Sequence, residues 1–392
     1  MPTVTEGTSA ARRRWLAAAA AAWLARHGVS AAAPRNSATT SATTAAATAA
    51  PPLLATAWND ARGRHLVGLL ALAGERIRIA ASIEVPTRAH SIAVEPGGAV
   101  LAVARRPGDW LLRWHPRRAA TRGAAQWHWS GDERCFTGHT LRSPDGRHLF
   151  TAETDLRSGA GLLVQRDTDS LSVLREWPTR GSDPHDLQWL PSGRLLVANG
   201  GIPTLPETGR AKRALDRMDS SIVEIDPRDN EPGRALRLPD PRLSLRHLAL
   251  HPSGQVAIAL QAEHDEPADR AQAPVLALYD PATEALRSVS HAPLLQRPIL
   301  QGYGGDVAAL PQGWVVSCPR AGQLAFFALD GSWQDQQPLA DACALAESGS
   351  QVWAVGSRAV IALGGAPVGP CGVAGLQIDN HAVVWRQQPA PG

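Results

Sequence analysis

Five histidines open similar short apolar segments of this sequence, and imidazole is both a good ligand for iron, copper and zinc and the usual axial ligand of haem. Asp306 and Cys343 stand at the corresponding place in two further segments, and carboxylate and thiolate groups also bind these metals. These residue types predict a metal or ligand site, provided that the fold brings them together. The five histidines are His90, His139, His185, His247 and His381.

Six of these segments predict a tight β-hairpin. Each apolar run ends in a turn that contains glycine, and a second apolar run follows. The turn glycines recur 36 to 61 residues apart, which is the spacing of propeller blades with loop insertions. These glycines are Gly98, Gly146, Gly193, Gly254, Gly313 and Gly349.

Counting strands predicts an all-β, seven-bladed β-propeller over residues 53–392. Six repeats supply six blades, and a split blade would combine the C-terminal segment 376–385 with the N-terminal runs 53–58, 65–70 and 76–83. Closing the ring with strands from both termini removes exposed sheet edges. The first residue of each inner strand would then lie at one mouth of the central channel. The seven candidate ligands would form one ring there.

Other polar residues are expected near the same mouth. Arg134 and Arg246 lie close to histidines in the sequence, and the guanidinium fork suits carboxylate or phosphate binding. Asp186 and Asp379 neighbour histidines and are candidates to orient imidazole rings. Asn199 and Asn380 complete the predicted ligand-binding set. The insertion 202–219 contains four basic residues and is interpreted as a lid over an anionic ligand such as a carboxylate siderophore or a haem propionate, or as a solvated loop.

The N-terminus predicts export from the cytoplasm. Three arginines, Arg12 to Arg14, precede an aromatic residue, a leucine and a short apolar stretch, as in a twin-arginine signal peptide over residues 1–33. Residues 34–52 are rich in Ala, Thr and Ser and are predicted to be a linker. The apolar stretch is too short for a stable membrane span, and a net charge of +3 does not indicate nucleic-acid binding.

The cysteines indicate no particular disulfide pairing. Four are present, and an even number in an oxidising compartment permits three connectivities. The sequence contains no Cys-x-x-Cys-His, His-Glu-x-x-His or Gly-x-Ser-x-Gly motif, so no known catalytic constellation is assembled. The four are Cys135, Cys318, Cys343 and Cys371.

Seven ordered blocks of the chain resemble the signature blocks of domain-of-unknown-function family 1513. The resemblance implies a twin-arginine-exported, periplasmic, seven-bladed propeller whose genes often lie beside genes of iron acquisition. The chain departs from the usual family residues at Cys135, Asp306 and Cys318. The blocks are Arg134–His139, Asp183–Leu187, Val197–Ile202, Leu243–Leu248, Gly302–Val307, Ser317–Arg320 and Asp379–His381.

Three classes of function fit these observations. The first is a periplasmic binding or accessory protein of iron or haem acquisition, which holds a metal, a small ligand or an iron-uptake partner without performing chemistry. The second is a metal-dependent oxidoreductase that uses the histidine ring. The third is an interaction platform with structural histidines, each donating across to a neighbouring blade. We rank them in this order, so we favour a protein that is not an enzyme and whose candidate cofactors are iron, copper or haem.

Overall fold

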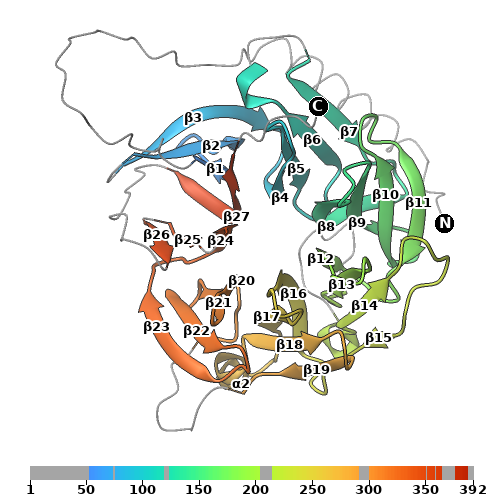
Figure 1. The fold of residues 1–392 in the computed structure, drawn as a ribbon, viewed down its shortest axis with the longest axis vertical. Helices are drawn as coiled ribbons and strands as arrows, with labels where there is room; N and C mark the ends of the chain where they lie inside the picture. The colour runs from blue at the N-terminus through green and yellow to red at the C-terminus, as the bar shows by residue number, and fades with distance from the viewer. Residues whose placement is uncertain are drawn as a thin grey trace, which may run out of the picture.

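Seven antiparallel sheets surround a central channel in the computed structural model (Figure 1). The structure describes residues 53–73, 76–118, 123–203, 214–290, 300–349, 351–357, 359–363 and 376–386. The predicted signal peptide and linker, Cys371 and three basic residues of the predicted lid (Arg210, Lys212 and Arg213) lie outside this described part. The predicted seven-bladed β-propeller is confirmed.

The first three sheets to follow β3 along the chain each contain four strands, in which the strand nearest the channel comes first. They are formed by β4 (Ala89–Val94), β5 (Val100–Ala104), β6 (Trp110–Trp114) and β7 (Ala125–Trp129); by β8 (Arg134–Arg142), β9 (His148–Asp155), β10 (Gly161–Asp167) and β11 (Val173–Pro178); and by β12 (Pro184–Trp189), β13 (Leu195–Asn199), β14 (Ser221–Ile225) and β15 (Ala235–Leu236).

The next three sheets repeat this order, and the third of them has three strands. They are formed by β16 (Leu243–Leu250), β17 (Val256–Ala262), β18 (Leu276–Asp280) and β19 (Ala285–Ser288); by β20 (Asp306–Leu310), β21 (Gly313–Cys318), β22 (Gln323–Ala328) and β23 (Trp333–Pro338); and by β24 (Ala344–Ser348), β25 (Gln351–Val355) and β26 (Val360–Leu363).

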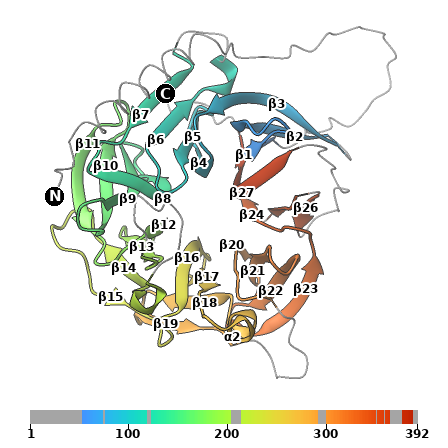
Figure 2. The same cartoon turned by 180° about the vertical axis from the view of Figure 1, so that it is seen from behind.

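The remaining sheet joins segments from far apart in the sequence. Its strand order is β27 (Gln377–Trp385), β1 (Leu53–Asn59), β2 (His65–Ala73) and β3 (Arg76–Val85). β27 lies at the channel, where it contacts β4 on one side and β24 on the other, and the view from behind shows the same ring (Figure 2). Helical elements in the described ranges are short: η1 (Pro116–Arg118), η3 (Leu215–Arg217) and α2 (Pro267–Gln272).

The predicted hairpin turns are present between the first two strands of the six blades. At Gly98, Gly146, Gly193 and Gly254 the backbone has a positive φ, and each glycine N–H donates to the carbonyl oxygen three residues earlier. Glycine adopts this conformation at little cost. These four turns therefore join the two strands of their hairpins at the positions that the sequence predicts.

Apolar side chains between neighbouring sheets form the core. Six tryptophans fill much of this space, and each of them is at most 8% exposed. Trp385 illustrates their role, because its indole N–H donates to the carbonyl oxygen of Gly98 on the adjoining sheet (2.9 Å). No helix within the described ranges is both long and apolar enough to cross a membrane. The six are Trp58, Trp110, Trp114, Trp314, Trp353 and Trp385.

Candidate functional site

Each inner strand that carries a histidine departs from regular pairing at that histidine. The register shifts between Ala89 and Ile92, between Phe136 and Thr140, between Pro184 and Asp186, and between Leu245 and Leu248. Pairing of β27 with β1 shifts in the same way around His381. By contrast, β20 and β24 pair without a shift. Because a β-bulge redirects a side chain, these irregularities aim the five imidazoles into the channel.

The histidines lie inside the channel and not at the first residue of each strand, which corrects the expectation from the sequence. β8, β16 and β27 begin at Arg134, Leu243 and Gln377, several residues before their histidines. The bulge interrupts the regular alternation of side chains along the strand. The sequence pattern therefore predicts only the part of the strand that follows the bulge. Four of the five are 2% to 7% exposed: His90, His185, His247 and His381.

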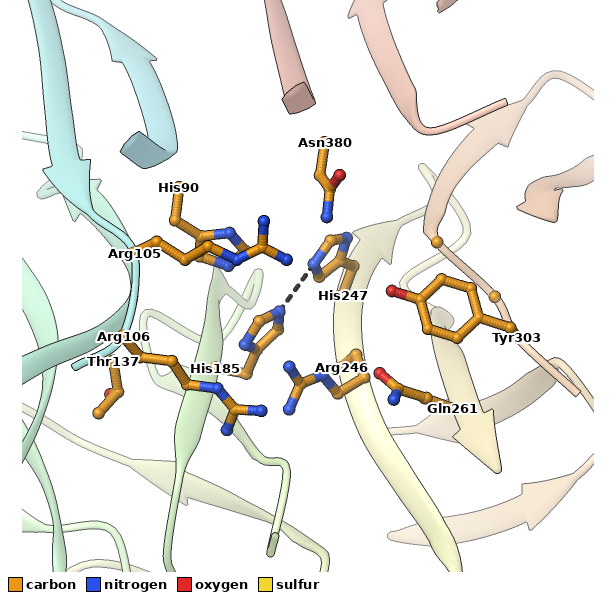
Figure 3. A pocket seen from close by; sticks show the side chains of 12 residues that line it. His90, Arg105, Arg106, Thr137, His185, Arg246, His247, Gln261, Tyr303 and Asn380 are labelled. Carbon is orange, nitrogen blue, oxygen red and sulfur yellow. Dashed lines mark hydrogen bonds between the residues drawn. The ribbon is translucent and has the colours of Figure 1, made fainter. Parts of the chain in front are cut away.

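The five imidazoles form one compact group, the histidine cluster. One ring nitrogen from each of His90, His139, His247 and His381 lies within 4.8 Å of the others. His139 Nε2 is 3.3 Å from His381 Nε2. The fifth member, His185, places its Nε2 2.8 Å from His247 Nε2 (Figure 3). Segments up to 291 residues apart in the sequence, from 90 to 381, therefore meet at one point.

Two aspartates orient members of this cluster. The Nδ1 atoms of His139 and His247 lie 2.9 Å from Asp186 Oδ1 and 3.1 Å from Asp306 Oδ1. A carboxylate oxygen accepts hydrogen bonds, so each Nδ1 carries a proton, and in the neutral form of the ring Nε2 presents a lone pair. This arrangement is the carboxylate–histidine pairing that accompanies metal ligation.

The same aspartates connect neighbouring blades. Asp186 Oδ2 accepts from the backbone N–H of Leu248 (2.8 Å), and Asp306 Oδ2 accepts from that of Leu345 (2.8 Å). Ser91 occupies the equivalent place after His90, because its Oγ accepts from the backbone N–H of Thr140 (3.3 Å). The residue that follows the histidine thus links its blade to the next one through a hydrogen bond. Asp306 therefore holds the position of Asp186, which follows a histidine. It does not hold the position of the histidine with which the sequence pattern aligned it.

Several cluster nitrogens have no hydrogen-bond partner among the residues that the structure describes. Both ring nitrogens of His90 and the Nδ1 of His185 are buried without a hydrogen bond. Buried polar atoms are normally satisfied, and an orphaned one indicates a missing water, ion or ligand. Burial lowers the pKa of His90, His185 and His381 well below its usual value, and neighbouring imidazoles lower it further. These rings are therefore neutral, which is the form that binds metals.

His139 differs from its neighbours. Burial alone would lower its pKa, but the Asp186 carboxylate outweighs that effect and raises the pKa above its usual value. Burial likewise opposes ionisation of Asp186, yet His139 and the surrounding N–H groups hold the pKa of that carboxyl below its usual range. The pair stabilises positive charge at this side of the cluster, whether it is carried by a proton or by a metal ion.

The spacing of the cluster fits a metal ion. Two nitrogens bound to one ion at about 2.0–2.1 Å lie about 2.9–3.4 Å apart when adjacent and at most about 4.2 Å apart when opposite. The separation of 3.3 Å between His139 Nε2 and His381 Nε2 agrees with adjacent ligands, whereas the 2.8 Å contact between His185 and His247 is a hydrogen bond. The upper limit of 4.8 Å across the cluster requires a closing movement of several tenths of an ångström.

A small cavity of about 30 Å³ adjoins the cluster and opens beside a larger one of about 400 Å³. His90, His185 and His247 line the small cavity together with three arginines, Arg105, Arg106 and Arg246 (Figure 3). Burial and the neighbouring Arg106 guanidinium lower the pKa of Arg246. The cavity next to the cluster therefore accepts something of the size of one water molecule or ion.

The predicted polar residues divide into two groups. Arg246 and Asn380 line the small cavity, whereas both carboxylate oxygens of Asp379 accept from Arg88. Arg134 pairs instead with Glu176 (2.9 Å). Asn199, Cys343 and Asp306 also lie outside the lining of the small cavity.

Asn199 is fully buried and donates from Nδ2 to the Thr179 carbonyl oxygen (2.9 Å) and to Ser221 Oγ (3.1 Å). Cys343 is a free thiol that lines the larger cavity and not the histidine cluster. Asp306 orients His247 and does not face the cluster as a ligand. Thus two of the seven predicted ligands occupy other positions, because β20 and β24 lack the bulge that redirects the side chains.

Sequence reasoning missed Arg105, Arg106, Asp183, Gln261 and Tyr303. The position of two of these residues in the sequence does indicate that they lie near the histidines. The second strand of a hairpin ends beside the start of the first, as in the pairing of Ala89 with Ala104, so residues after the second strand lie at the histidine end. Arg105 and Arg106 hold that position. Asp183 precedes β12 and accepts from Arg246 Nη1 (2.9 Å).

The fold and the cluster define a β-propeller with converging histidines in its channel. The chain belongs to the family described as protein of unknown function DUF1513, whose model matches residues 83–385. No curated protein matches the sequence.

Solved structures share the architecture at low sequence identity. The periplasmic gluconolactonase of Pseudomonas aeruginosa is 13% identical with a TM-score of 0.51, and the alignment covers 74% of this chain and 83% of that one. A functionally unknown protein from Desulfotomaculum acetoxidans is 12% identical with a TM-score of 0.46, covering 72% and 84%. These similarities concern the fold alone.

Proposed function

We propose that this protein binds one transition-metal ion at the histidine cluster of its channel and serves as an exported binding or accessory protein. The observation that carries the proposal is the convergence of ring nitrogens from His90, His139, His247 and His381 within 4.8 Å. Neutral imidazoles suit iron, copper, zinc and nickel. The two orienting aspartates supply the negative charge that a divalent ion requires nearby.

The geometry favours an ion over haem. Ring centroids within the cluster lie between 4.5 Å and 6.3 Å apart, and the adjoining cavity has about 30 Å³. An axial imidazole must contact the iron at the centre of a porphyrin, and that macrocycle is many times larger than this space. A single ion fits between the rings without displacing a blade.

A structural role for the histidines explains less. Histidines that only tie blades together would have their ring nitrogens engaged by backbone or side-chain groups. Here the blade-to-blade bonds come from Asp186, Asp306 and Ser91, whereas neither ring nitrogen of His90 has a hydrogen-bond partner within the described part of the chain. Asp186, Asp306 and Ser91 thus link the blades, and the histidine nitrogens are left to bind a ligand.

Iron is the metal that the family resemblance favours, and the arginines of the N-terminus support export. Cell fractionation tests the location: the wild-type chain should reach the periplasm, and an Arg13→Lys, Arg14→Lys variant should remain in the cytoplasm. Equal export of both would contradict the twin-arginine route.

Elemental analysis of untagged protein tests the metal site. We expect about one equivalent of a transition metal in the wild-type protein and none in a His139→Ala, His247→Ala, His381→Ala variant. A matched control replaces three histidines outside the cluster, His65, His148 and His264, with alanine and should keep the metal. Wild-type protein that contains no metal and takes up none on titration with Fe²⁺, Cu²⁺ or Zn²⁺ would refute the proposal.

A further inference from the structure

The larger cavity continues directly from the cavity beside the histidine cluster. Arg105, Gln261, Tyr303, Gly305 and Asn380 line both, so these residues form a neck between them. At about 400 Å³ the outer space has the size of a small-molecule site. An occupant of the outer cavity would reach the cluster through a polar neck.

Positive charge exceeds negative charge around this neck. Among the described residues, four arginines line the two cavities, whereas one carboxylate, that of Asp341, does so. The lining arginines are Arg105, Arg106, Arg246 and Arg320.

The carboxylates that support these arginines are each shared by two guanidinium groups. Asp183 contacts both Arg106 and Arg246, and Asp379 contacts both Arg88 and Arg105. One carboxylate neutralises only one of two cations, and Arg106 and Arg246 are both buried beside Asp183, so unbalanced positive charge stays on that side of the neck. A buried cation is costly without a counter-charge, and an anionic ligand would supply it.

Neutral hydrogen-bonding groups complete the lining. Tyr303, Gln261 and Asn380 present a hydroxyl and two amides toward the neck (Figure 3). Arg320 lies over the Tyr303 ring, with its guanidinium carbon 4.4 Å from the ring centroid, and is exposed at the outer side. Such groups suit the uncharged polar part of an organic molecule. An inorganic anion would fill only a small fraction of the space.

We propose that the outer cavity binds a small organic carboxylate, with Arg105 at the neck and Arg320 at the rim as its main cationic contacts. The guanidinium fork matches a carboxylate in geometry as well as charge. This site does not depend on the metal, although a bound cation would strengthen it and would lie within reach of a ligand in the neck.

Calorimetric titration of metal-free and metal-loaded protein with citrate, succinate, uncharged succinamide and inorganic phosphate tests this proposal. We expect citrate and succinate to bind both forms and succinamide to bind neither. Arg105→Gln should weaken carboxylate binding about tenfold or more, because it removes a charge-assisted contact. Arg320→Gln, at an exposed position that leaves folding unaffected, should weaken it about threefold to tenfold.

The control is Arg147→Gln, which removes the same charge from an exposed turn after β8 and should bind carboxylates like the wild type. Four results would overturn the proposal: no binding of either carboxylate by either form, equal binding of succinamide, binding of phosphate alone, or affinities that neither Arg105→Gln nor Arg320→Gln changes. Metal content is measured on the same samples. Carboxylate binding by metal-free protein would support this proposal even where the metal proposal fails.

Discussion

Replacement of Asp186 by asparagine should weaken metal binding without unfolding the propeller. In the native chain Asp186 Oδ1 accepts from His139 Nδ1 (2.9 Å) and from the Leu187 backbone N–H (2.8 Å), while Oδ2 accepts from the Leu248 backbone N–H (2.8 Å). Asparagine has one acceptor oxygen and one donor group in place of the two oxygens. It cannot satisfy all three donors in either orientation.

With the amide oxygen toward His139, asparagine keeps the bonds from His139 and Leu187 but breaks the bond between blades. In the orientation that keeps the bond between blades, the oxygen faces Leu248 and the Leu187 N–H loses its acceptor. The amide N–H then faces His139 Nδ1, so the imidazole must turn its lone pair to that side and carry its proton on Nε2. A protonated Nε2 cannot bind a metal. Loss of such an outer partner typically lowers metal affinity about 10- to 100-fold, which corresponds to about 1.4–2.7 kcal/mol of binding free energy.

Competition with a chromophoric chelator measures the metal Kd of each variant, and circular dichroism checks the fold. The matched control is Glu347→Gln, because Glu347 Oε1 also accepts a backbone N–H from the neighbouring blade (Ala309, 2.8 Å) but contacts no cluster histidine. A folded Asp186→Asn protein whose Kd stays within about twofold of wild type would refute the tautomer argument. An equal loss in Glu347→Gln would show that blade linkage alone is responsible.

Two further substitutions or probes test other parts of the structure. In Gly138→Ala the added methyl group would lie 2.0 Å from the carbonyl oxygen of His185. We therefore expect a loss of about 1–3 kcal/mol in unfolding free energy and a lower metal content. Urea denaturation with the same midpoint as the wild-type protein would contradict this expectation. Burial raises the pKa of the Cys343 thiol to about 12, so about one thiol in ten thousand is ionised at pH 8. Iodoacetamide should therefore leave Cys343 unmodified in folded protein and alkylate it in urea, as followed by mass spectrometry. Rapid alkylation of the folded chain at pH 8 would contradict the raised pKa of this thiol.

The repeated hairpins made the fold predictable. A glycine turn such as that at Gly146 must sit between two short apolar runs, and recurrence of that unit leaves few alternatives to a propeller. The site was less accessible because it depends on bulges, which add one unpaired residue and shift all later side chains. Asp306 aligned with the histidines in the sequence, yet its regular strand gives it the position of Asp186.

The arginines were hidden for a related reason. Arg105 and Arg106 follow a second strand and reach the channel only through the pairing of β5 with β4, a non-local contact that no short motif records. Cys343 was grouped with the histidines because its segment resembles theirs, but it precedes a strand that pairs without a bulge. The local pattern thus located the strands, and the tertiary register decided which side chains meet.

X-ray absorption spectroscopy of the untagged protein as isolated tests the central claim most directly, because it reports the atoms that surround the metal. The histidine cluster predicts a metal edge, nitrogen neighbours at about 2.0–2.2 Å with the multiple-scattering pattern of imidazole, and no sulfur neighbour at about 2.3 Å. A sulfur shell would place a thiolate in the coordination sphere. A metal without imidazole scattering would assign binding to another part of the chain, and either result would contradict the site described above.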